Sequence, residues 1–449
     1  MKKIFTIISI LLITASALNA QVTIYVKADA TGANNGTSWS NAFTSLKLAI
    51  NTAFEGDRIW VAYGTYTSTT GVDACFEISK DIKLYGSFSG TETTLSQRVF
   101  GNEYTSILDG ENEKRVVLTT NLTANAVIDG FLITGGNGGD FGIGGIWNDS
   151  SSPTLSNLSI SGNIGGGICN DNASPTITNV KICGNSNINS LGGGIFNRTS
   201  APILTNVAIF GNTARMGGGI ANSAESSPTL INVTIAGNFA SEYADGVANF
   251  SSTPIFQNCI IWGNGNYGVY NQDSSPAYTY CLVQEENNLQ GAGNINAEGI
   301  AEGAVFVNIV NASISNPTTN GNYQLKSGSP CINTGSNSFN SSTTDLAGNP
   351  RIYHTTIDMG AYEYTGTVGI NGFCAKSMNI YPNPANNYIF VDGLNAGDKI
   401  SITNIAGVKL MEVKVKANAD TQYIDVSSLR SGMYIIRVEG GELNVLIKN

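Results

Sequence analysis

Side chains that could catalyse a reaction are sparse in the middle of the chain. Between residues 116 and 290 the basic residues are Lys181, Arg198 and Arg215, and the acids are scattered. Glycoside hydrolysis needs two carboxylates at a defined separation. We expect no two acids at equal positions in the Gly-rich strands of neighbouring repeats. The sequence therefore predicts no catalytic set, and it leaves open a site assembled across loops.

Patterns that could hold a metal or a cofactor are equally thin. Gly135-Gly-Asn-Gly-Gly-Asp140 matches the start of a Ca²⁺-binding nonapeptide repeat, but it occurs once, and such sites are built between successive turns. His354 is the only histidine, and it has no histidine or cysteine partner for a metal site. We therefore expect neither a metal nor a cofactor.

The elements that would position any site come from an internal repeat with a proline at the start of each unit. Apolar residues recur at fixed distances after this proline and alternate with polar or variable residues, as in strands with one buried face. A further strand, Gly-rich at its start, precedes each proline. The prolines are Pro153, Pro175, Pro202, Pro228, Pro254 and Pro276. The predicted inward columns are Leu155, Ile177, Leu204, Leu230, Phe256 and Tyr278; Leu158, Val180, Val207, Val233, Cys259 and Cys281; Ile160, Ile182, Ile209, Ile235 and Ile261; and Ile146, Ile168, Ile195, Ile220, Val247 and Val269.

Three short strands per unit, separated by Gly, Asn and Pro turns, describe one coil of a right-handed parallel β-helix. Each coil lies about 4.8 Å above the previous one, so like side chains stack on like. An isolated coil cannot bury its apolar side, and several must assemble together. A leucine-rich repeat would need a different leucine spacing, and a propeller would need longer, four-stranded repeats. The predicted fold class is therefore all-β, with a three-stranded solenoid.

Asparagines recur at the turns of this repeat. Asparagine tolerates left-handed backbone conformations, and stacked amides bond to one another, so we interpret these lines as structural ladders. The first line is Asn157, Asn179, Asn206, Asn232 and Asn258. The second is Asn163, Asn185, Asn212, Asn238 and Asn264, and the third is Asn148, Asn170, Asn197, Asn222, Asn249 and Asn271.

One edge of the repeat could bind a ligand. Length differences between units fall before the Gly-rich strand, at Ser186–Leu191, Thr213–Met216 and Phe239–Ala244. Variable loops on one edge of a solenoid often form its functional face. The outward column beside them is Trp147, Cys169, Phe196, Ala221, Ala248 and Tyr270. Of these, Trp147, Phe196 and Tyr270 are the candidate glycan-binding residues, and packing against the loops is the alternative.

The cysteines do not form the framework of a small disulfide-stapled domain, because there are 7 of them without close pairs. Cys259 and Cys281 share an inward column on adjacent coils. Core packing is the expected role of both. A disulfide between them is also open, since neighbouring strands approach closely enough.

The N-terminus predicts export. Met1-Lys2-Lys3 is followed by a mostly apolar run, and Ala20 suits the last position before cleavage, so residues 1–20 read as a signal peptide. Its removal takes two lysines and no acid from the chain, so the formal charge changes from −10 to −12. An acidic surface argues against binding to nucleic acid. No later segment is long and apolar enough to span a membrane, so none is expected in the mature form.

Two segments resemble parts of known bacterial β-helices. Phe43 to Ala53, FTSLKLAINTA, has apolar positions at helical spacing and would cover the first coil. With the strands that follow, it resembles the opening of pectate-lyase-like β-helix proteins. Tyr323–Gly335, Asp345–Arg351 and Ile357–Glu363 together resemble the closing segment of the choice-of-anchor Q family of exported β-helices. The resemblance covers residues 22–364 and implies the fold and export, but no established chemistry.

Lyases of the pectate-lyase-like type use Ca²⁺-binding acids together with Arg or Lys. In this sequence Lys181 lies on a different predicted strand from Arg198, and Arg215 lies in the loop before its strand. The pattern of such a lyase is therefore not reproduced here.

The C-terminal part has a different pattern. Tyr381-Pro-Asn-Pro384 is followed by alternating strands between 388 and 447, which predicts a small Ig-like antiparallel β-sandwich. NIYPNPANNYIFVDG, ITNIAGVKL, IDVSSLRSGMYIIRVEGG and the terminal VLIKN resemble the type A sorting domain of the type IX secretion system. This resemblance covers residues 377–449. It implies the type IX machinery as a partner, passage across the outer membrane, removal of the domain, frequent attachment to surface lipopolysaccharide and a Bacteroidetes-type host.

The predicted organisation has six parts. They are a signal peptide (1–20), an N-terminal cap with the first coils (21–115), regular coils (116–290), closing coils with the C-terminal segment of the helix (291–364), a linker (365–376) and the sorting domain (377–449).

Three functions stay open. The first is a non-enzymatic surface or secreted protein for adhesion or glycan binding. The second is a polysaccharide lyase or glycoside hydrolase, which acids clustered with Lys or Arg on one groove would favour. The third is a structural protein without a specific ligand, which a smooth surface of Ser, Thr and Asn would favour.

Overall fold

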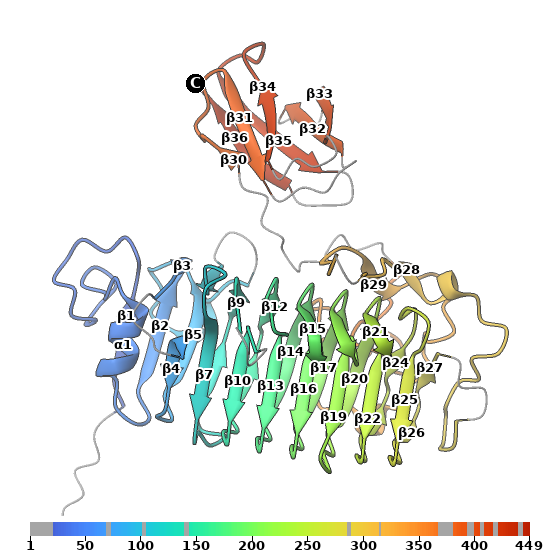
Figure 1. Cartoon of the computed structure of the whole chain (residues 1–449). Helices are drawn as coiled ribbons and strands as arrows, with labels where there is room; N and C mark the ends of the chain where they lie inside the picture. Colours follow the sequence, from blue (N-terminus) through green and yellow to red (C-terminus); the bar gives the residue numbers. More distant parts are fainter. Residues whose placement is uncertain are drawn as a thin grey trace, which may run out of the picture.

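A computed structural model describes residues 21–68, 73–100, 105–138, 143–284, 289–313, 316–366, 380–392, 399–404, 408–415, 421–438 and 443–449. It confirms the all-β fold, a right-handed parallel solenoid followed by antiparallel sheets. The coils are stacked side by side along one axis (Figure 1). Among the described residues, no helix is long and apolar enough to cross a membrane.

Sheet B is the eight-stranded parallel sheet that contains the Gly-rich strands. Its strands follow the chain from one end of the solenoid to the other, one per coil. They are β4 (Ala74–Ile78), β7 (Arg115–Thr120), β10 (Ile146–Asp149), β13 (Ile168–Asp171), β16 (Ile195–Arg198), β19 (Ile220–Ser223), β22 (Val247–Phe250) and β25 (Val269–Gln272).

Sheet A holds the other two strands of each coil. In three successive coils these two strands are continuous, as β14 (Thr176–Cys183), β17 (Ile203–Phe210) and β20 (Thr229–Ala236). One row of separate strands is β1 (Thr23–Val26), β2 (Arg58–Ala62), β5 (Lys83–Phe88), β8 (Val127–Asp129), β11 (Thr154–Ser156), β23 (Ile255–Gln257) and β26 (Ala277–Thr279). The other row is β3 (Gly64–Tyr66), β6 (Ser106–Asp109), β9 (Phe131–Thr134), β12 (Ser159–Ser161), β24 (Ile260–Ile261) and β27 (Leu282–Val283).

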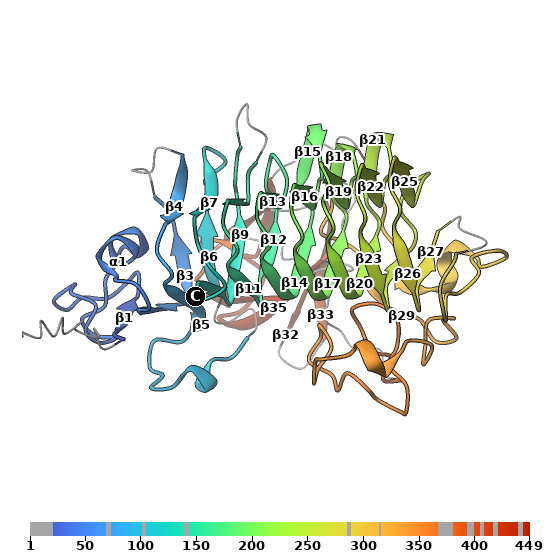
Figure 2. The same ribbon diagram turned by 90° about the horizontal axis from the view of Figure 1, so that it is seen from below.

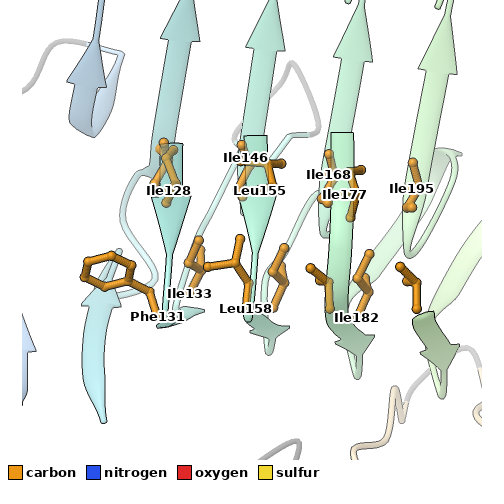
Figure 3. Packing of buried hydrophobic residues seen from close by; sticks show 14 of the residues in the cluster. Ile128, Phe131, Ile133, Ile146, Leu155, Leu158, Ile168, Ile177, Ile182 and Ile195 are labelled. Carbon is orange, nitrogen blue, oxygen red and sulfur yellow. The ribbon is translucent and has the colours of Figure 1, made fainter. Parts of the chain in front are cut away.

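The core lies between the two sheets. Apolar residues of successive coils, such as Ile146 and Ile168 of sheet B and Leu155 and Ile177 of sheet A, are buried in one cluster (Figure 3). The strand registers align these columns directly, since Ile146 is the register partner of Ile168 and Leu155 is the register partner of Ile177. Removing apolar area from water along the whole stack stabilises coils that could not fold singly.

The asparagine side chains form hydrogen-bonded ladders along the stack. In the inward line of sheet B, Asn170 Nδ2 donates to Asn197 Oδ1 at 2.8 Å, and Asn197 Nδ2 donates to Asn222 Oδ1 at 2.8 Å. The line that begins at Asn157 lies at the bend of sheet A. Its five members have φ between 51° and 56°, the left-handed region that asparagine tolerates. The ladder of sheet B thus pairs buried amides within the strands, and the line that begins at Asn157 holds a bend of the coil.

Three of the segments expected as variable loops are strands. β15 (Ser186–Leu191), β18 (Thr213–Met216) and β21 (Phe239–Tyr243) pair in parallel and form a third sheet, sheet C, beside sheet B (Figure 2). Arg215, expected in a loop, therefore lies on a strand, β18. An asparagine of the second line, such as Asn185 or Asn212, directly precedes each of these three strands. The hydrogen bonds between these asparagines align the strands, and this alignment lets their backbones pair.

Both ends of the solenoid carry additional segments. Helix α1 (Leu46–Thr52) begins at Ser45, whose side chain accepts a hydrogen bond from the Leu48 N–H, and it buries Leu46, Ala49 and Ile50. At the other end, β28 (Phe306–Asn308) and β29 (Asn322–Leu325) pair antiparallel. The expected helix within Phe43–Ala53 is thus present.

The closing segment runs back along the outer face of sheet A. The Ala361 N–H donates to Thr234 Oγ1 at 2.9 Å, and Asn206 Nδ2 donates to the Thr344 carbonyl at 2.9 Å. A second apolar cluster joins the two layers, in which Phe210 and Tyr323 rings lie 4.5 Å apart. This segment therefore covers apolar surface that sheet A would otherwise expose.

The C-terminal domain has two antiparallel sheets around its own apolar cluster, as expected for a small sandwich. One sheet is β30 (Ile380–Tyr381), β31 (Tyr388–Asp392) and β34 (Thr421–Asp425). The other is β33 (Lys409–Lys414), β32 (Lys399–Asn404), β35 (Gly432–Val438) and β36 (Leu443–Lys448).

Candidate functional site on sheet B

The outward face of sheet B presents two parallel columns of side chains, because alternate residues of each strand point away from the core. The column nearer to sheet C is Leu118, Trp147, Cys169, Phe196, Ala221, Ala248 and Tyr270. The second column, which we call the polar stripe, contains Asp149, Asp171, Arg198, Ser223, Phe250 and Gln272.

Trp147, a candidate from the sequence, is half-buried and partly covered by an arginine. The Arg115 guanidinium carbon lies 4.4 Å from the centre of the Trp147 ring, a cation–π contact. Arg115 Nε also donates to the Ile143 carbonyl at 3.1 Å, and burial lowers the pKa of this arginine. The Trp147 indole N–H is buried without a hydrogen-bond partner among the described residues. Arg115 thus covers one face of the Trp147 ring, and no described residue accepts a hydrogen bond from its indole N–H.

Phe196 and Tyr270 lie against sheet C. Both belong to a small cluster around Ala221, Ala244 and Ala248, which are almost fully buried. For Phe196 this is the packing role that the sequence left as the alternative. The three aromatic candidates are two and three coils apart, so they do not form one continuous aromatic row.

The C-terminal end of the column is more aromatic than the sequence indicated. The Tyr270 ring stacks on Tyr243 of sheet C with centroids 5.0 Å apart, and Phe250 lies 6.0 Å from Tyr270. Tyr243 is 49% exposed and Tyr267 is 58% exposed. Tyr243 escaped the sequence analysis because its proximity to Tyr270 depends on the formation of sheet C, and Phe250 did so because it lies one residue beyond the asparagine that ends the repeat pattern.

The expectation that no two acids share a position in neighbouring Gly-rich strands is wrong. Asp149 and Asp171 are register partners, and Arg198 follows in the next coil. Both strands continue one residue beyond the asparagine that ends the repeat pattern, and this extra residue is aspartate in each. Two stacked carboxylates repel each other, and the neighbouring guanidinium offsets this repulsion.

Arg198 forms an ion pair with Asp171. Its Nε donates to Asp171 Oδ1 at 2.8 Å, and its second nitrogen bonds to Oδ2. The side chain of Asp171 is 9% exposed and that of Arg198 is 56% exposed. The hydrogen bond to Asp171 raises the pKa of Arg198. The exposed side of the guanidinium can still donate to a ligand, because a carboxylate engages only part of its five N–H groups.

The other reactive residues named from the sequence do not join this site. Burial lowers the pKa of Lys181 to about 8, and Asp345 of the closing segment opposes this shift. Arg215 pairs with Glu242 at 3.3 Å within sheet C. The His354 ring packs edge to face against Tyr353 in the closing segment. Part of the Gly135–Asp140 motif lies outside the described residues.

The described residues hold no group of three or more His, Cys, Asp or Glu side chains that could bind a metal. The site on sheet B is a surface of aromatic, carboxylate and guanidinium groups.

Comparison with protein families agrees with this organisation. Family models match residues 379–448 as a secretion system C-terminal sorting domain and residues 141–293 as a right handed beta helix region. A third model, a protein of unknown function (DUF1565), matches residues 29–213. A comparison with curated protein sequences gave no match.

Solved structures that a comparison matched to this chain include a pectate lyase and a pectin methylesterase. The pectate lyase Pel9A is 14% identical, with a TM-score of 0.48, over 77% of this chain and 97% of the other. The pectin methylesterase from Aspergillus niger is 14% identical, with a TM-score of 0.30, over 62% of this chain and 81% of the other.

The sorting-domain match implies handling by the type IX secretion machinery and delivery to the cell surface or the extracellular space. The chain is a right-handed parallel β-helix protein with a C-terminal type IX sorting domain.

Proposed function

We propose that the exported β-helix binds an extended polysaccharide along the polar stripe of sheet B. The observation that carries this proposal is the run of register-paired side chains from Asp149 through Asp171 and Arg198 to Ser223, with Trp147 beside it. The pair Phe250 and Gln272, with Tyr270 beside it, follows at the end of the sheet. Adhesion to a glycan-bearing surface would follow from such binding.

The chemistry of the stripe suits a sugar chain. Arg198 and the two aspartates offer charge-assisted hydrogen bonds to hydroxyl groups. Phe250, Tyr270 and Trp147 offer apolar faces and edges against which a sugar ring can pack. Because the coils repeat at about 4.8 Å, the same kinds of contact recur along an elongated ligand.

The test is retention of the full exported chain by a panel of acidic and neutral polysaccharides in affinity electrophoresis. We expect Trp147→Ala to weaken binding about fivefold and Arg198→Ala about tenfold, from the usual strengths of an aromatic contact and a charged hydrogen bond. Phe54→Ala is the matched control, since Phe54 is 68% exposed near the N-terminal cap, away from sheet B.

Equal retention of the wild-type chain and both stripe variants would refute binding at this surface. Failure of every polysaccharide to retain the wild-type chain would favour a structural role without a ligand.

Polysaccharide cleavage is the second candidate, and one observation favours it. Asp149 and Asp171 lie on adjacent coils with Arg198 beside them, so two carboxylates and a cation share one outward-facing column. Glycoside hydrolysis needs two carboxylates at a defined separation. Incubation of the chain with the same panel, with and without Ca²⁺, followed by mass spectrometry, would reveal shortened products. Loss of these products in Asp149→Asn, with retention unchanged, would establish cleavage rather than binding alone.

A further inference from the structure

Two buried thiols face each other on the last regular coils. Cys259 lies between β23 and β24 and Cys281 between β26 and β27, and the flanking strands are register partners. The two residues are 1% and 0% exposed, respectively.

The geometry of stacked coils is compatible with a covalent bond between them. Adjacent strands lie about 4.8 Å apart. A disulfide joins residues whose Cα atoms are about 4.4 to 6.8 Å apart. Rotation of the two side chains can therefore bring the sulfur atoms together without moving either coil. This rotation would break the weak bonds from Cys259 Sγ to the Gln257 carbonyl, 3.2 Å, and from Cys281 Sγ to the Thr279 carbonyl, 3.4 Å.

The chain also meets conditions that oxidise thiols. Its sorting domain implies export, and disulfides form and persist outside the cytoplasm. Cys183 is already disulfide-bonded in the structure, whereas Cys259 and Cys281 are both held as thiols.

We propose that Cys259 and Cys281 are joined by a disulfide in the exported protein. A thiol–disulfide oxidoreductase supplies the oxidising disulfide. One thiolate attacks this disulfide to form a mixed disulfide, and the second thiolate displaces the oxidant as a dithiol. The two cysteines lose two protons and two electrons, and the oxidant gains the electrons.

Oxidation has to precede closure of the core. The thiolate is the attacking species, and burial raises the pKa of Cys259 in the folded chain. The bond therefore forms while the last coils are still unpacked.

The disulfide closes the loop that contains β25. This loop carries Tyr270 of the candidate site, and among the described residues β25 is the last strand of sheet B, paired with β22. Closing the loop removes entropy from the unfolded chain and secures the terminal coil.

The experiment is disulfide mapping of the full exported chain. The protein is denatured in iodoacetamide without a reductant, and it is then cleaved before aspartate and after lysine. Cleavage before Asp273 separates Cys259 from Cys281, between which there is no Lys or Arg, and cleavage after Lys326 separates Cys281 from Cys331. We expect a cross-linked pair of peptides that carries no label, whereas Cys75, which is buried and free, is labelled.

Labelling of both Cys259 and Cys281 before reduction would overturn the proposal. A cross-link between Cys281 and Cys331, which is also buried, would overturn it as well.

A thermal measurement gives an independent check. Reductant should lower the melting temperature of the wild-type chain by roughly 5 to 10 °C more than that of the Cys259→Ala/Cys281→Ala variant. The variant retains Cys183, so it controls for reduction of the other disulfide. An equal shift in both proteins would contradict the proposal.

Discussion

The replacement of Asn197 by alanine tests whether the ladder of sheet B stabilises the solenoid by keeping buried amides paired. Asn197 is 0% exposed, and its amide accepts from Asn170 and donates to Asn222, both at 2.8 Å. Asn197→Ala leaves one donor and one acceptor buried without partners. Each orphaned group costs about 1 to 3 kcal/mol, so we expect a loss of about 2 to 6 kcal/mol.

Two comparisons separate the cost of orphaned groups from the loss of bonds. Asn271→Ala, at the exposed end of the ladder, removes one bond and orphans one group, the amide donor of Asn249, so it should cost about 1 to 3 kcal/mol. The double variant Asn170→Ala/Asn197→Ala again orphans two groups, on Asn148 and Asn222, and breaks one more bond. Its cost should exceed that of the single variant by only about 1 kcal/mol.

The assay is guanidinium unfolding of the full chain, combined with hydrogen exchange of the amides in β16. Hydrogen exchange is needed because repeat proteins can unfold in parts. The reasoning would be refuted if Asn197→Ala cost no more than Asn271→Ala. It would also be refuted if the double variant cost the sum of its two single variants.

Two further predictions concern buried charges. Burial, aided by Asp358, raises the pKa of Glu363 from its ordinary 4.5 to about 7. Its protonated form therefore contributes stability below pH 4.5 that is lost as the pH rises through about 7. The wild-type melting temperature should fall more steeply than that of Glu363→Gln between these values, and parallel curves would contradict this. Arg98→Ala leaves the buried Asp129 without its ion-pair partner and should cost about 3 kcal/mol in thermal unfolding. Arg98→Lys should recover less than half of this loss, because lysine lacks the planar fork that also contacts the ring of Tyr85; full recovery would show that charge alone matters.

Part of the candidate site could be predicted from the sequence, because the repeat assigns each residue to a column. Trp147, Phe196 and Tyr270 point outward on sheet B as that assignment requires. Their surroundings could not be predicted. Arg115 covers Trp147 from the strand one coil earlier, and Tyr243 stacks on Tyr270 from sheet C. Both contacts join residues whose separation in the sequence is not set by the repeat.

The aspartate pair shows a different limit of the sequence. Asp149 and Asp171 each follow the last asparagine of the repeat pattern, where the strand was expected to have ended. Backbone pairing with the neighbouring coils extends β10 and β13 by this residue, and so it aligns the two carboxylates. The end of a strand depends on the hydrogen bonds of its neighbours rather than on local propensity.

The sequence by itself determined the solenoid. Apolar residues and asparagines recur at fixed positions after each proline, and only stacking one coil on the next brings these equivalent residues together. The sequence also determined the separate C-terminal sandwich, whose strands alternate without that recurrence. Only the tertiary structure decided that the segments of sheet C pair with each other and that residues 331–364 lie along sheet A. The residues that make these contacts do not recur at a common interval in the sequence. Their positions depend on how the folded surfaces fit together and bury one another, which no single repeat unit encodes.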